Sequence, residues 1–222
     1  MKLIKSVSGI RGIYNKSFNL NEVIKHGYAF SKLQKQNNFP FLIARDSRQS
    51  GFEISQHLIK FLNKIGRDVI NADIIPTPTA QFITDKFKIA GAIVITASHN
   101  PVEWNGMKFI DCDGTFLNQM KNDKLFKIAT NLSINNIHNN AVKGKTNNYI
   151  EAIDVHLDNV LNINFINIDK IKEKKFKIVL DTINGASCLG FKKLLKLLDC
   201  DISPINDTPN GLFPREPEPK TE

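Results

Sequence analysis

The sequence predicts an α/β protein with a mixed, mainly parallel sheet sandwiched by helices, followed by an incomplete second α/β domain. Two observations lead to this fold class. Short apolar runs alternate with amphipathic helical patterns from about residue 19 to residue 117. A polar, Asn-rich stretch from about Thr130 to Asn148 then precedes a second strand–helix–strand pattern. Such alternation is typical of sheets covered by helices on both faces.

The first long helix is predicted from Asn19 to Asn37. Asn19 is a suitable N-cap because Glu22 follows three residues later, as in a capping box. Phe41–Ala44 is a short, continuously apolar run, which is typical of a strand buried on both faces. The helix should therefore pack its apolar stripe against a buried sheet. This stripe consists of Val23, Ile24, Gly27, Phe30 and Leu33.

Two further helices and two further strands follow the same pattern. Ser50 and Glu53 have capping-box spacing, and Gly66 is a natural stop after the apolar face that they precede. The next predicted strand, Val69–Ile75, ends at a run with two prolines, and Thr79 is expected to cap the helix after it. The last strand of this set is predicted over Ala90–Thr96.

The second region predicts a βαβ unit. Its strands are expected at Phe176–Leu180 and Asp201–Ile205, with a helix over Ser187–Leu198 between them. The last fourteen residues hold four prolines and few apolar side chains, so they do not close a hydrophobic core. We therefore expect a domain over residues 1–140 and the start of a second over 149–222, with the chain stopping inside that second domain.

Composition and charge exclude several classes of protein. No apolar run is long enough to span a bilayer, and the N-terminus lacks the features of a signal peptide, which predicts a cytoplasmic protein. The net charge is +8, but the lysines are dispersed and no nucleic-acid recognition motif accompanies them. We expect neither nucleic-acid nor membrane partners, and the sequence leaves the oligomeric state open. The three cysteines have no metal or disulfide spacing.

The strongest candidate site is the loop Thr96–Pro101, directly after a predicted buried strand. Loops at the carboxyl ends of parallel strands commonly bind ligands in α/β proteins. Ser98 can carry a phosphoryl group, while His99 and Asn100 can hydrogen-bond to it. A polar turn in which Ser98 and Asn100 only cap backbone groups explains the loop about equally well.

Other residues have the chemistry to join such a site. Gly106 is expected to permit a tight turn back towards the loop, and Lys108 then starts a strand from which its amine can face the same cleft. Arg11 lies between two glycines and offers a bidentate fork to phosphate. In Arg45–Arg48, a structural role is preferred for Asp46, and the roles of Arg45 and Arg48 stay open.

Together these segments resemble the α-D-phosphohexomutase superfamily. The matching segments occur in the family's order and run from about Leu3 to the C-terminus. Among members, Trp104 and the Pro217–Pro219 ending look most like phosphoglucosamine mutases of the bacteroidete and archaeal kind, of which this chain would be an N-terminal fragment. The main matches are Ser8–Gly12, Arg45–Arg48, Pro76–Thr79, Thr96–Pro101 and Asn105–Lys108.

The resemblance implies an activity and a set of roles. It implies intramolecular phosphoryl transfer on a hexose phosphate, through phosphorylated Ser98 and a hexose bisphosphate intermediate. Lys108 would be the general acid or base, with His99 as a further catalytic residue. Arg11, His99 and Asn100 would bind phosphate. One Mg²⁺ would bridge the Ser98 phosphate and an aspartate-rich loop.

The sequence departs from the family in its metal and sugar sites. The aspartate-rich metal loop, the sugar-recognition loop and the C-terminal phosphate-binding loop are all missing. We therefore expect this chain alone to be inactive as a mutase. Glucosamine 6-phosphate is the favoured substrate and glucosamine 1-phosphate the product. A phosphomannomutase or phosphoglucomutase, or a non-catalytic phosphate-binding remnant, remains an alternative.

Overall fold

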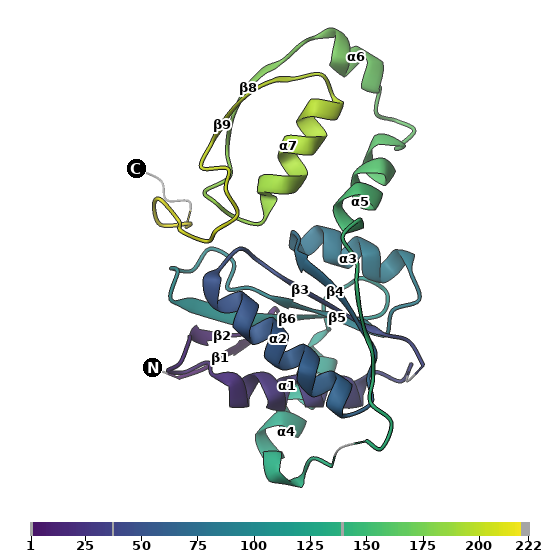
Figure 1. Cartoon of the computed structure of the whole chain (residues 1–222), viewed down its shortest axis with the longest axis vertical. Helices are drawn as coiled ribbons and strands as arrows, with labels where there is room; N and C mark the ends of the chain where they lie inside the picture. Colours follow the sequence, from purple (N-terminus) through teal and green to yellow (C-terminus); the bar gives the residue numbers. More distant parts are fainter. Residues whose placement is uncertain (1, 37, 139, 219–222) are drawn as a thin grey trace.

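The computed structural model describes residues 2–36, 38–138 and 140–218 (Figure 1). Within these residues the chain forms a large sheet with its helices and a smaller strand–helix–strand part. Figure 1 shows the smaller part above the larger one, with α5 between them. No helix in the described residues has the length and apolarity needed to cross a membrane. The expected α/β fold is confirmed, with the second α/β part incomplete.

The large sheet is mixed. Strands β7, β4, β3 and β5 are mutually parallel, β6 and β1 run the other way, and β2 again runs with the first group. Most of its strands thus share one direction, as the sequence predicts. In order across the sheet, the described strands are β1 (Ile4–Ser6), β2 (Gly9–Ile13), β6 (Trp104–Ile110), β5 (Gly91–Ile95), β3 (Phe41–Arg45), β4 (Val69–Ile74) and β7 (Thr146–Asn148).

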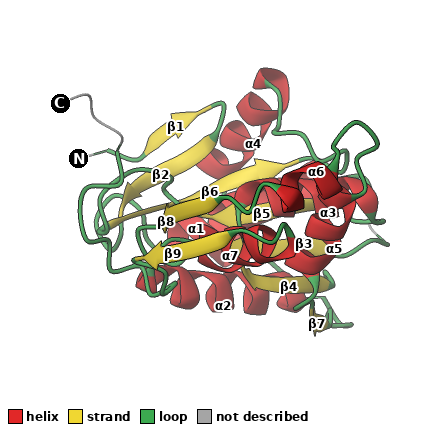
Figure 2. Ribbon diagram, turned by 90° about the horizontal axis from the view of Figure 1, so that it is seen from above, coloured by secondary structure: helices red, strands yellow, loops and turns green. Residues whose placement is uncertain are grey.

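Helices cover both faces of this sheet, as Figure 2 shows from above. Alternate residues of a strand point to opposite faces. Phe41 and Ile43 accordingly join the core under α1, α2 and α4, whereas Leu42 and Ala44 join the core under α3. The helices of this part are α1 (Leu20–Leu33), α2 (Gln49–Lys64), α3 (Thr77–Lys86) and α4 (Gln119–Asn131), with a short 3₁₀ turn η1 (Ile134–Asn136).

The predicted start of α1 is confirmed. The side chain of Asn19 accepts a hydrogen bond from the backbone N–H of Glu22 at 3.1 Å. The helix ends at Leu33, earlier than predicted, because Gln34 is already extended. The predicted end at Asn37 lies outside the described residues.

Two predicted caps are wrong. Helix α2 begins at Gln49, so Ser50 lies inside its first turn, where its hydroxyl accepts a hydrogen bond from Asn105. Helix α3 begins at Thr77, so Thr79 also lies inside the helix, where its hydroxyl contacts His156 at 2.9 Å. In both cases a tertiary hydrogen bond uses the hydroxyl that local spacing assigned to a cap.

The smaller part is a parallel βαβ unit, as predicted. Strands β8 (Lys177–Asp181) and β9 (Asp201–Ile205) pair in parallel, and α7 (Ser187–Leu197) connects them. Helix α5 (Ala152–Leu161) packs on both α3 and α7 and so joins the two parts, and α6 (Ile168–Glu173) follows it. The Asn-rich segment before α5 ends as the edge strand β7 of the large sheet.

Candidate functional site

The loop after β5 holds Ser98 in an unusual backbone conformation. Ser98 has a φ of +55°, in the left-handed region that residues with a side chain seldom adopt. Its N–H donates to the hydroxyl of Thr96 at 3.0 Å, and that hydroxyl donates to Asp46 at 2.7 Å. These hydrogen bonds hold the backbone of Ser98 in this conformation. Ser98 itself is exposed, just beyond the end of a strand that is fully buried.

Arg48 holds the same loop from behind. Its side chain is fully buried and donates to the carbonyl groups of Ser98 (2.9 Å), Asn100 (2.7 Å) and Pro101 (2.5 Å). The carboxylate of Asp46 lies 3.1 Å from Nε of Arg48 and balances the charge of the guanidinium. Three carbonyls of one loop therefore share a single guanidinium, which makes Arg48 a positioning residue for that loop. The sequence left this role open.

The pairing of β2 with β6 brings Arg11 and Lys108 to the loop. Arg11 lies directly opposite Gly106, and a Cβ at position 106 would lie 2.1 Å from the carbonyl oxygen of Ile10. The predicted turn at Gly106 is therefore wrong: this glycine is inside β6, where close contact with β2 requires it. Lys108 likewise lies within β6 rather than at its start.

A small pocket lies where these elements meet. It has a volume of about 120 Å³, and Arg11, Ser98, His99 and Lys108 are among its lining residues. Arg11 donates from one terminal nitrogen to Asn100 at 2.9 Å, while its buried Nε–H has no partner. A guanidinium N–H without a partner, on a residue that lines the same pocket as Ser98, is suited to an oxygen of a phosphate group.

The surroundings of Lys108 shift the titration of its amine. Burial lowers the pKa of this amine below its ordinary value, and the charge of Arg11 lowers it further, while Asp46 opposes both. A lowered pKa makes an amine a better partner in proton transfer, and Lys108 and Ser98 line the same pocket. The pocket thus brings together a serine, a lysine with a lowered pKa and an arginine.

The smaller part contributes to the site through its last described residues. The Nε2 atom of His99 is 3.0 Å from a carboxylate oxygen of Glu218, with both side chains about half exposed. The Phe213 ring lies 4.9 Å from the guanidinium carbon of Arg48. Glu218 and Phe213 of the smaller part therefore contact His99 in the loop and Arg48 behind it. The carboxylate of Glu218 is the partner of His99. No local pattern in the sequence indicates these contacts.

The residues that the structure describes do not provide a complete magnesium site. They contain no group of three or more acidic, histidine or cysteine side chains that can hold a metal ion. Ser98 alone of the predicted ligands is present, and its hydroxyl without an aspartate cluster does not meet the preference of Mg²⁺ for several oxygen ligands.

The fold and the pocket together define an α/β protein with an exposed serine in the loop that follows a buried strand. The profile of the phosphoglucomutase/phosphomannomutase alpha/beta/alpha domain I matches residues 2–136. The profile of domain II of the same family matches residues 154–222. The chain therefore belongs to the phosphoglucomutase/phosphomannomutase family, as the resemblance predicts.

Individual relatives match nearly all of this chain but only about half of their own length. A phosphoglucomutase/phosphomannomutase of Thermococcus kodakarensis is 35% identical, over 96% of this chain and 47% of its own length. A phosphoglucosamine mutase of Prochlorococcus marinus is 31% identical, over 96% of this chain and 46% of its own. A solved family member from Burkholderia thailandensis superposes with a TM-score of 0.74 at 24% identity, over 96% of this chain and 47% of that one. The chain spans about half the length of the curated relatives it matches.

Proposed function

We propose that this chain carries the phosphoserine site of a phosphohexomutase, with Ser98 as the residue that receives and returns the phosphoryl group. One observation carries the proposal: Ser98, Lys108 and Arg11, which come from three separate segments of the chain, line a single pocket of about 120 Å³. The left-handed backbone at Ser98 further supports it, because conformational strain of this kind is concentrated at functional sites.

The proposed step transfers one phosphoryl group from a hexose bisphosphate. The Ser98 oxygen attacks phosphorus, forming an Oγ–P bond, while the bond between phosphorus and the sugar oxygen breaks. Lys108 takes the serine proton, and the departing sugar oxygen takes a proton from water, so that phosphoserine and a hexose monophosphate result. In the reverse direction the phosphoryl group returns to the other hydroxyl of a reoriented sugar.

The other predicted residues have roles in binding. Arg11 contacts phosphoryl oxygens through its unpaired Nε–H, and Asn100 orients this guanidinium by accepting a hydrogen bond from it. His99 binds phosphate after it leaves Glu218, its present partner. Magnesium, when bound to the Ser98 phosphate, would neutralise charge during transfer, and its further ligands are not among the residues described.

The substrate class rests on the relatives. Those named above are phosphoglucosamine mutases and phosphoglucomutase/phosphomannomutases, which supports a hexose phosphate. We infer glucosamine 6-phosphate and glucosamine 1-phosphate as the pair that is interconverted, with mannose or glucose phosphates as the second candidate.

Phosphorylation of Ser98 tests the proposal directly. The purified chain is incubated with glucose 1,6-bisphosphate and magnesium, and intact and peptide mass spectrometry then locate any added phosphate. We expect one phosphate on Ser98 and none in Ser98→Ala. Ser8→Ala removes a hydroxyl from the same pocket and should still be phosphorylated, so it is the matched control.

The pH dependence tests the role of Lys108. Because the neutral amine accepts the proton, the rate of phosphorylation should rise with pH, with its midpoint below the ordinary pKa of lysine. Lys108→Met should slow the step by roughly 10²- to 10⁴-fold and remove this dependence. Equal phosphorylation of the unaltered chain and of Ser98→Ala, or phosphate located at another residue, would overturn the proposal.

A further inference from the structure

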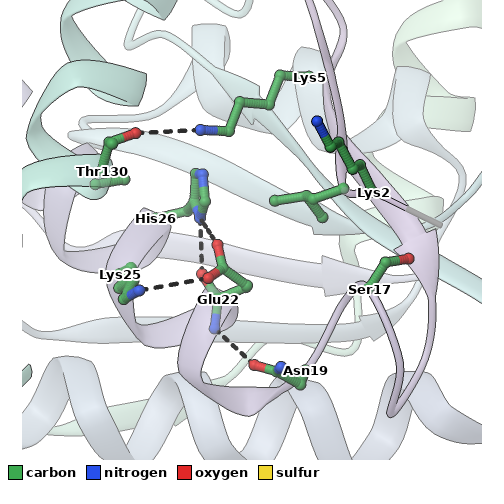
Figure 3. Close-up of a pocket in the computed structure, with 10 residues that line it drawn as sticks. Lys2, Lys5, Ser17, Asn19, Glu22, Lys25, His26 and Thr130 are labelled. Atoms are coloured by element: carbon green, nitrogen blue, oxygen red, sulfur yellow. Dashed lines mark hydrogen bonds and ion pairs between the residues drawn. The ribbon is translucent and has the colours of Figure 1, made fainter.

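A second pocket lies between the N-terminal strand β1, the start of α1 and the end of α4 (Figure 3). Its volume is about 390 Å³, and the residues of the proposed phosphoserine site do not line it. Strand β1 separates the two pockets, since Lys5 faces this one and the next residue, Ser6, lines the other. Successive residues of a strand point to opposite faces, which explains this division.

The pocket contains a buried histidine with an unused nitrogen. The side chain of His26 is 1% exposed, and its Nδ1 lies 2.8 Å from the backbone oxygen of Glu22. This contact makes Nδ1 the donor, so that Nε2 is left buried without a partner. Figure 3 shows the ring with its Nδ1 edge towards Glu22 and its other edge on the side of Lys5. A buried polar atom without a partner is rare and points to a ligand or a water molecule.

The charges around the pocket are mainly positive. Lys2, Lys5 and Lys25 line it, and Glu22 supplies a negative charge, 3.5 Å from Lys25. Lys5 donates to the hydroxyl of Thr130, which leaves two of its three N–H bonds for a ligand. The positive excess selects an anion, and the volume leaves room for an organic group beside a phosphate.

We propose that this pocket binds the phosphate group of a phosphate monoester, with Lys5, Lys25 and His26 as its direct ligands. The ligand oxygens accept hydrogen bonds from both ammonium groups and from Nε2 of a protonated His26. Binding thereby gives the buried Nε2 of His26 the hydrogen-bond partner that it lacks. The site is separate from the Ser98 loop, and nothing in its chemistry requires phosphorylation of that serine.

Binding should be coupled to proton uptake by His26. Burial lowers the pKa of the free imidazole, and Lys5 and Lys25 lower it further, while the backbone oxygen and the carboxylate of Glu22 oppose this. Phe126 and Thr130, which α4 contributes here, do not titrate. An anion against Nε2 favours the charged ring, so the pKa of His26 rises on binding. Affinity should therefore increase as the pH falls from about 8 to about 6.

The experiment is a titration of the whole chain with inorganic phosphate, followed by NMR of the histidine ring nitrogens. His26→Gln and His99→Gln assign the signals of the two rings. We expect the His26 nitrogens to move from the neutral Nδ1–H pattern to the protonated pattern along a saturable curve. Changes at His99 report phosphate in the Ser98 pocket, so failure of one site is distinguishable from failure of the other.

Sulfate is the second probe, because its charge is constant over this pH range. Lys5→Gln should weaken binding of either anion about tenfold by removing a charged hydrogen bond. Lys124→Gln is the matched control, since it removes the same charge from an exposed position of α4 that does not line the pocket. This variant should bind as the unaltered chain does.

Two results would overturn the proposal in a chain that circular dichroism shows to be folded. One is the absence of a saturable change at His26, which would mean that only water occupies the pocket. The other is equal weakening by Lys5→Gln and Lys124→Gln, which would indicate a general effect of net charge.

Discussion

The two sheets of this protein differ in how much of their surface is buried. All five residues of β5 and four of the five in β3 are buried, whereas β8 and β9 contain no buried residue. Both hydrophobic cores lie on the faces of the large sheet. The proposed phosphoserine loop begins at the end of β5, so Ser98 is attached to a strand whose residues are all buried. The smaller part reaches the same loop through the half-exposed His99–Glu218 pair and through Phe213, which packs on the buried Arg48.

The largest expected effect comes from removing apolar volume in the two sheets. Ile93, in β5, is fully buried, and Ile93→Ala should lower the free energy of unfolding by about 2–5 kcal/mol. Val179, in β8, is 70% exposed, and Val179→Ala should change it by less than about 0.5 kcal/mol. Urea unfolding followed by the fluorescence of Trp104, the only tryptophan and a residue of β6, measures both. Similar losses in the two variants would contradict the comparison.

The next effect distinguishes two arginines of one segment. Arg48→Met leaves Asp46 and three loop carbonyls without their donor in a buried site, so a loss of about 3 kcal/mol is expected. Arg45 instead pairs at 2.6 Å with Asp73, whose side chain is 62% exposed, and Arg45→Met should cost less than about 1 kcal/mol. Urea unfolding measures both losses.

Phosphorylation separates a positioning role from a merely structural one. Arg48→Met should also slow phosphorylation of Ser98, even at temperatures where the variant is fully folded, whereas Arg45→Met should not. Equal stability and equal phosphorylation of the two variants would show that Arg48 does not hold the loop.

The sequence predicts those parts of the fold in which a local pattern determines the structure. The continuous apolar runs of β3 and β5 and the Asn19 cap of α1 are of this kind. It does not predict β2, because this strand contains two glycines in five residues and its stability comes from pairing with β6. Helix α4 is also missed, since only a few of its residues are buried.

The residues of the candidate site also divide into those that a local pattern indicates and those that only distant contacts bring together. Local chemistry suggests Ser98, and only the order of Arg11 and Lys108 along the chain suggests that they join it. The clamp by Arg48 and the partner of His99 depend on contacts between residues that are 50 or more positions apart. No local pattern contains such pairs, so the sequence leaves Arg48 open and assigns His99 no partner.

A smaller effect tests the backbone strain at Ser98. Ser98→Gly removes the cost of a side chain at a φ of +55°, whereas Ser98→Ala retains it. The glycine variant should therefore be more stable than the alanine variant by about 1 kcal/mol. Both should fail to accept phosphate. Thermal unfolding compares them, and equal stability would mean that the loop is not strained at this position.

The smallest effect concerns the contact between the smaller part and the loop. His99 and Glu218 are 48% and 46% exposed, so water and salt screen their attraction. A double-mutant cycle with His99→Gln and Glu218→Gln should give a coupling energy below about 1 kcal/mol, which decreases as salt is added. Phosphorylation of Ser98 should be as fast or faster in Glu218→Gln, because His99 is then free to bind phosphate. A coupling of several kcal/mol would instead show that the smaller part holds the loop as firmly as β5 does, and the contrast between the two sheets would then not extend to the site.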